Sequence, residues 1–176
     1  MNMLFNYIFV LLTLFSTLFA KSDFTVEAQP RVIEAAQQIQ QYGVLKQKPN
    51  GYLYVEVSRE FIATILPMIQ TQGKLKAPGH CTSKKGIGPH ISVIYDQEKT
   101  EHTIGEIAEL GKTIHFRVKQ LRTVHVQSKN QKLWILACDA PDLEKLRVQY
   151  GLGALLHGHD FHITLATESA AATPAP

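Results

Sequence analysis

The feature that most constrains this chain is a short pattern that occurs twice: histidine, an apolar residue, serine or threonine, and an apolar residue. The two copies are His90-Ile91-Ser92-Val93 and His162-Ile163-Thr164-Leu165. Successive side chains of a β-strand point to opposite faces of its sheet. Each copy therefore predicts a strand with its histidine and hydroxyl on one face and its apolar residues on the other, buried face.

Each copy also ends a similar run of elements. The first run is a strand at 52–57, a helix at 59–72 that Pro67 should interrupt, and a long loop at 73–89. The second is a strand at 133–138, a helix started by Asp139 and Pro141, and a loop at 151–159. We therefore predict an α+β fold of two pseudo-symmetric β-α-β lobes, with antiparallel sheets around a central cleft that brings the two histidine strands together.

Elsewhere the spacing of apolar residues predicts a helix at 31–42 closed by Gly43, a short helix at 104–110, and strands at 113–120 and 122–127. His115 and His125 lie on the polar faces of those strands, where we expect them to be solvated. The predicted organisation is a signal peptide at 1–20, an N-terminal lead-in and helix at 21–50, one domain with both histidine motifs at 51–167 and a disordered tail at 168–176.

The first twenty residues differ in kind from the rest. An apolar run at 4–19 ends at Ala20, just before the first charge at Lys21. This is typical of a secretory signal peptide, and the alternative is an uncleaved membrane anchor. We expect a secreted or periplasmic protein. In that setting Cys81 and Cys138 are a candidate disulfide, and the other interpretation is one buried residue and one free thiol.

Composition limits the class of ligand. The chain has 176 residues, of which 45% are apolar and 19% charged, and its formal net charge is +3. These values fit one globular domain, without the clustered positive charge of a duplex-binding protein, and they are compatible with a small anionic ligand.

Two histidines on facing strands suit phosphodiester hydrolysis. One imidazole can take a proton from water while the other protonates the leaving oxygen. The hydroxyls of Ser92 and Thr164 could hold the non-bridging phosphate oxygens. Candidate additions to the substrate site are Lys84 and Lys85, on the loop before the first histidine strand, and Tyr95, near the end of that strand.

The paired motifs resemble those of the 2H phosphoesterases, over roughly residues 51–167, and cyclic phosphodiesterase modules of RNA-repair proteins look most similar. The resemblance implies a metal-independent reaction, without a cofactor, that opens a 2′,3′-cyclic phosphate or a related cyclic or 2′-5′ linkage. It also implies that His162 with Thr164 handles the attacking water while His90 protonates the departing oxygen. We expect a nucleotide or RNA end as substrate, no duplex DNA, no stable membrane association after signal cleavage, and a monomer.

Two other functions stay open at this point. His157, His159 and His162 form an H-x-H-x-x-H cluster, a spacing that binds zinc or copper in some exported proteins. The domain could instead bind a nucleotide or phosphate without turning it over.

Overall fold

The computed structural model describes residues 24–126 and 131–169. The predicted signal peptide and residues 170–176 lie outside these ranges. In the described residues no helix is both long enough and apolar enough to cross a membrane. The strands are β1 (Phe24–Val26), β2 (Tyr42–Gln47), β3 (Leu53–Glu56), β4 (Lys74–Lys76), β5 (His90–Ile94), β6 (Thr113–His115), β7 (Arg117–Val126), β8 (Gln131–Asp139) and β9 (Phe161–Ser169). The helices are α1 (Pro30–Gln38), α2 (Glu60–Ala63), the 3-10 turn η1 (Leu66–Met68), α3 (Gly79–Thr82), α4 (Asp96–Glu101) and α5 (Pro141–Gln149).

The described strands form one mixed-length sheet in the order β1-β7-β8-β9-β5-β3-β2-β6, with β4 added beside β9. All of their pairings are antiparallel. β3 pairs with β5, β8 pairs with β9, and the two histidine strands pair with each other. The α+β class and the antiparallel pairing are as predicted. The two-lobed pseudo-symmetric arrangement is not confirmed, because both histidine strands belong to a single sheet.

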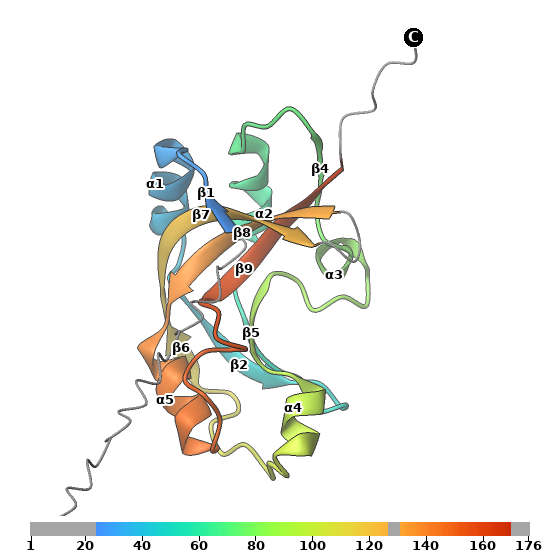
Figure 1. Ribbon diagram of the computed structural model, residues 1–176, viewed down its shortest axis with the longest axis vertical. Coiled ribbons are helices and arrows are strands. Elements are labelled where there is room, and N and C mark those ends of the chain that lie inside the picture. Colours follow the sequence, from blue (N-terminus) through green and yellow to red (C-terminus); the bar gives the residue numbers. More distant parts are fainter. Residues whose placement is uncertain (1–23, 127–130, 170–176) are drawn as a thin grey trace, which may run out of the picture.

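One face of this sheet carries the hydrophobic core. Ile91 and Val93 of β5 and Ile163 and Leu165 of β9 are fully buried, as the alternating pattern predicts. Helices from both halves of the chain contribute to the same cluster, among them α1 with Ala36, α2 with Phe61 and α5 with Leu143. Figure 1 shows α1 and α2 at the upper end of the view and α4 and α5 at the lower end.

The predicted helix at 31–42 is too long. α1 ends at Gln38, and Gln41 donates hydrogen bonds from its side chain to the carbonyls of Ala36 and Ile39. Tyr42 and Gly43 belong to β2 instead. Gly43 closes no helix there; it is required because a Cβ would collide with the carbonyl oxygen of Glu56 on β3.

Two other helix predictions need correction. The predicted helix at 59–72 is reduced to α2 and η1, with Pro67 inside η1, so the chain is interrupted as expected but the helix is much shorter. No helix forms at 104–110. The helix of this region is α4, which starts at Asp96, where Glu98 accepts a hydrogen bond from the Tyr95 amide and acidic residues occupy the first turn.

The cysteines do not form a disulfide. Cys81 and Cys138 are both free: Cys81 is half-buried in α3, whereas Cys138 points into the core from β8. Burial raises the pKa of the Cys138 thiol, which makes it unreactive. The tail predicted at 168–176 starts too early, because β9 continues to Ser169 and the Glu168 carboxylate accepts hydrogen bonds from Thr71 and Trp134.

Candidate active site

The two motifs meet where β5 pairs with β9. Ile91 lies opposite Ile163, and the antiparallel register therefore sets His90 opposite Thr164 and Ser92 opposite His162. All four polar side chains are half-buried on the face turned away from the core, which we call the His face. The two histidines are diagonal neighbours, a relation that separates Cα atoms by roughly 7–8 Å. This spacing leaves room for one phosphate group between two imidazoles.

Both imidazoles are fixed in the same way. Nδ1 of His90 lies 2.9 Å from the carbonyl oxygen of Gly88, and Nδ1 of His162 lies 3.1 Å from that of Asp160. A carbonyl oxygen only accepts hydrogen bonds, so each Nδ1 carries the proton that is donated. The neutral ring then has its lone pair on Nε2. Each histidine therefore offers Nε2 as a proton acceptor.

Burial lowers the pKa of both histidines. For His90 the hydrogen bond to Gly88 acts in the opposite direction, while the charges of Lys48 and His162 add to the decrease. For His162 the hydrogen bond to the Asp160 carbonyl raises the pKa and so opposes the effect of burial. The charges of His159 and Arg122 lower the pKa further. Near neutral pH, both imidazoles of the free protein favour the uncharged form.

An aromatic stack encloses His90. The stack consists, in spatial order, of the rings of Tyr54, Tyr52, Tyr95 and His157. Consecutive ring centroids are 5.7, 5.8 and 5.4 Å apart, and the ring planes are nearly parallel. His90 meets the edges of Tyr52 and Tyr54 at 6.0 and 5.7 Å. Tyr52 and Tyr95 are thus each stacked between two other rings of the series, which forms a wall beside the imidazole of His90.

His80 completes this enclosure from the short helix α3, which lies within the long loop before β5. Its ring centroid lies 4.6 Å from that of His90, with the rings tilted by 67°. Burial, reinforced by the charges of His90 and Lys48, lowers the pKa of His80 to about 4. Gly86 is needed in this loop because a Cβ would collide with the backbone of His80. The sequence contains no periodic signal for this contact, which depends on how the loop folds back.

The structure places the other predicted substrate residues at different distances from the two motifs. Lys84 and Lys85 are exposed, and no described hydrogen bond or ion pair joins their side chains to the motifs. Lys48 instead lies at the site, with its ammonium 5.2 Å from the ring centre of Tyr52. Tyr95 is brought to the site edge through the aromatic stack.

Ser92 is held by a tyrosine that sequence reasoning missed. Its Oγ lies 2.6 Å from the Tyr52 hydroxyl, and either oxygen can donate. Burial raises the pKa of Tyr52 to about 12, so the phenol keeps its proton at neutral pH. A neutral phenol beside a hydroxyl can pass on a hydrogen bond to an anionic group at Ser92.

The flank beside His162 is built differently. A pocket of about 290 Å³ opens there between β1, β7, β8 and the loop before β9. Arg122 forms its wall, paired with Asp160 at 2.8 Å and stacked 4.0 Å from the ring centre of Phe24. Asp160 therefore serves both sides: its carboxylate holds Arg122 and its carbonyl holds His162.

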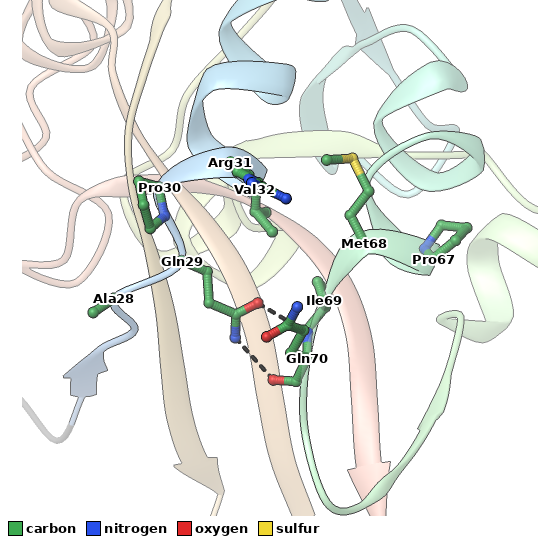
Figure 2. Close-up of a pocket in the computed structure, with 9 residues that line it drawn as sticks. All are labelled: Ala28, Gln29, Pro30, Arg31, Val32, Pro67, Met68, Ile69 and Gln70. Atoms are coloured by element: carbon green, nitrogen blue, oxygen red, sulfur yellow. Dashed lines mark hydrogen bonds between the residues drawn. The ribbon is translucent and has the colours of Figure 1, made fainter.

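A larger pocket, of about 580 Å³, lies elsewhere, between the start of α1 and η1. Figure 2 shows the paired hydrogen bonds of Gln29 and Gln70 that link its two sides. Arg31 is the sole ionisable residue in its lining, and no motif residue contributes. We find no acid–base chemistry in this pocket, despite its size.

The metal cluster of the alternative function does not assemble among the described residues, which contain no group of three His, Cys, Asp or Glu side chains suited to an ion. His157 stacks on Tyr95, and His159 lines the pocket beside His162. Of the three imidazoles of the H-x-H-x-x-H sequence, His159 and His162 line one pocket, whereas His157 packs on Tyr95 instead.

The comparison with protein-family models agrees with the geometry of the site. Neither the curated proteins nor the solved structures gave a match to the chain. The family model described as "Swiss Army Knife, 2H phosphoesterase domain" matches residues 53–172, a range that includes both motif strands, β5 and β9. The chain therefore belongs to the 2H phosphoesterase family, which implies a hydrolase that acts on phosphodiester bonds.

Proposed function

We propose that this protein hydrolyses a 2′,3′-cyclic phosphate of a nucleotide or RNA end, or a related cyclic or 2′-5′ phosphodiester, by acid–base catalysis from His90 and His162 without a metal ion. The observation that carries the proposal is the paired tethering of these two rings on adjacent strands, each through Nδ1, with Nε2 left to react.

The chemistry divides between the two imidazoles. One neutral ring takes a proton from water as the water oxygen forms a bond to phosphorus. The other ring, protonated, gives its proton to the ester oxygen as the phosphorus–oxygen bond breaks. The product is a phosphomonoester with one free hydroxyl, and the two rings have exchanged protonation states. Water and bulk solvent then restore them.

Two hydroxyls support the phosphate during this step. Ser92 and Thr164 lie opposite the two histidines, on the same face of the sheet. Donation from these hydroxyls to the non-bridging oxygens would favour the transition state, in which negative charge increases on those oxygens. Tyr52 supports Ser92 from behind through its own hydroxyl.

The experiment is a substrate panel in EDTA with product analysis by NMR. The panel contains 2′,3′-cyclic, 3′,5′-cyclic and 2′-5′-linked compounds. We expect turnover of the 2′,3′-cyclic nucleotide, and we expect His90→Ala or His162→Ala to lower kcat by about a hundredfold or more. His115→Ala is the matched control, because His115 is exposed on β6. Full activity in either motif variant would contradict the mechanism, and binding without turnover would favour a non-catalytic domain.

A further inference from the structure

The pocket beside His162 has an unexpected lining for its place in the fold. The side of a sheet turned away from the core usually carries polar residues. Here β7 and β8 present Val124, Leu133 and Ile135 on the His face, and Phe24 of β1 lies over them. Ile135 is 6% exposed although no described helix contributes to the lining. This apolar surface is directly continuous with His162.

The wall of the pocket carries a charge that is already paired. Arg122 is 8% exposed, donates to the side chain of Gln120 at 2.8 and 2.9 Å, and forms its ion pair with Asp160. Its guanidinium plane also covers the Phe24 ring. A second phosphate group of the substrate would have to compete with the Asp160 carboxylate for the Arg122 guanidinium. An uncharged ring can bind in the pocket without disturbing this ion pair. The pocket therefore favours a neutral, planar, largely apolar group.

On the opposite flank the pocket, of about 460 Å³, lies at the far end of the aromatic stack: Tyr95, His157 and residues of α4 line it, and His90 does not. Beside His90 the Tyr52 ring has a neighbour on each face, Tyr54 is 7% exposed, and His80 packs against the imidazole itself. None of the described pockets is lined by His90. A small molecule such as water fits this side more readily than a ring does. The two flanks thus differ although the two motifs match.

We propose that the pocket beside His162 receives an uncharged planar ring carried by the leaving alcohol of the substrate, such as the base of a nucleoside cyclic phosphate. The inference rests on the proposed function and assigns its two roles. Displacement at phosphorus is in line, so water enters opposite the leaving oxygen. His162, on the ring side, then protonates the leaving oxygen, and His90 takes the proton from water. This order is the reverse of the one that the family resemblance implies.

The first test compares a nucleoside 2′,3′-cyclic phosphate with glycerol 1,2-cyclic phosphate, which has the same reacting group and no ring. We expect kcat/KM to be higher for the nucleoside compound by about tenfold or more. Leu133→Gln should reduce this ratio towards one, and Val124→Thr, a change of similar volume, should reduce it in part. Val44→Gln is the matched control: Val44 is exposed on β2, beyond β3 on the sheet, and its variant should keep the wild-type ratio.

The second test separates the two roles with methyl p-nitrophenyl phosphate. Its planar ring belongs to the leaving group, and p-nitrophenolate departs without needing a proton. We expect His162→Ala to retain a much larger fraction of wild-type kcat on this diester than on the cyclic nucleotide. His90→Ala should lose activity on both, because the water still needs a base. A greater retention by His90→Ala would overturn the assignment.

Failure of this inference differs from failure of the proposed function. Equal kcat/KM for the ring-bearing and ring-free cyclic phosphates would overturn the ring site and leave the phosphodiesterase intact. A preference for a long alkyl phosphodiester would replace the planar ring by a chain as occupant, and so would also overturn it. If no diester is turned over, the proposed function fails. In that case calorimetry with adenosine 2′-monophosphate and glycerol phosphate still decides whether a ring is bound, since Leu133→Gln should weaken only the former.

Discussion

At the scale of single residues, the buried histidines determine how activity depends on pH. Burial lowers the pKa of both His90 and His162, so each ring gains its proton at a lower pH than a free imidazole does. Catalysis needs one neutral and one protonated ring, and both limbs of the profile move to lower pH together. We predict a bell-shaped dependence of kcat/KM with its maximum below about pH 6.5.

This profile is measured with a 2′,3′-cyclic nucleotide under conditions where substrate charge is constant. Its two midpoints belong to the coupled pair and not to individual rings. NMR titration of the imidazole protons in the free protein gives an independent value. A maximum well above pH 7 would show that burial does not dominate.

His80 provides a second residue-scale prediction. Its contact with His90 is edge-on packing at a short distance, and its pKa of about 4 keeps it uncharged near neutral pH. We infer that it positions the His90 ring. His80→Ala should lower kcat by about tenfold or more, because small misplacements of a catalytic group are costly. His80→Phe restores an aromatic edge and should recover most of this loss.

The readout that distinguishes positioning from proton transfer is the comparison of these two variants. Recovery by phenylalanine, which has no titratable nitrogen, supports packing, whereas equal loss in both would assign His80 a proton-transfer or substrate-binding role. His125→Ala, at an exposed site on β7, is the control.

What the sequence could reveal about these residues follows from strand alternation. It places His90 and Ser92 together on one face, and His162 and Thr164 likewise, because side-chain direction in a strand has a period of two. It could not reveal Tyr52 or His80. Tyr52 reaches Ser92 across a β3–β5 pairing whose register shifts beside Tyr54. His80 lies on α3, and its contact with His90 depends on how the chain between β4 and β5 folds.

At the scale of elements, one buried arginine of α5 links three elements: it forms an ion pair with α4 and donates a hydrogen bond to a backbone carbonyl of β5. Arg147, 1% exposed, donates to the carbonyls of Val93 and Gly153 and to both oxygens of Glu98. Replacing it with methionine leaves the Glu98 carboxylate without its partner. We predict that Arg147→Met lowers the free energy of unfolding by about 3–5 kcal/mol.

Urea denaturation measures this loss, and Arg117→Met is the matched control. Arg117 pairs with Asp139 at 2.9 Å, but its side chain is 73% exposed. Its variant should change the free energy of unfolding by about 1 kcal/mol or less. Similar losses in the two variants would show that burial of Arg147 does not make its ion pair special.

The elements that the sequence predicts well are those with a local cause. Pro141 starts α5, Pro67 interrupts the chain after α2, and the apolar alternation marks β5 and β9. The errors arise where distant contacts prevail over local spacing. Tyr42 fits a helical stripe, yet it becomes a strand residue because β2 must pair with both β3 and β6.

At the scale of the whole molecule, both halves of the chain share one sheet and one core cluster. Two separate lobes could unfold independently, but a shared core links them. We predict a single cooperative unfolding transition. Trp134 reports on tertiary packing from β8, where it is 1% exposed, so its fluorescence and the far-ultraviolet circular dichroism should follow the same urea curve. Separate midpoints would contradict this and favour two units.

Sequence reasoning reached the class of the fold and the meeting of the two motif strands but not the continuity of the sheet. Repeated β-α-β context is compatible with two facing sheets or with one, since the repeat says nothing of which edges join. The β5–β9 pairing resolves this, because it connects segments that are far apart along the chain.

Because of that same pairing, catalysis requires the sheet to be completely assembled. Under the proposed mechanism each motif supplies one half of a proton-transfer pair, so neither half has the activity alone. β9 is the last described strand, and a chain still under synthesis holds His90 without its counterpart. Under that mechanism an unfinished or partly folded chain has no hydrolase activity, and hydrolysis begins when β9 pairs with β5.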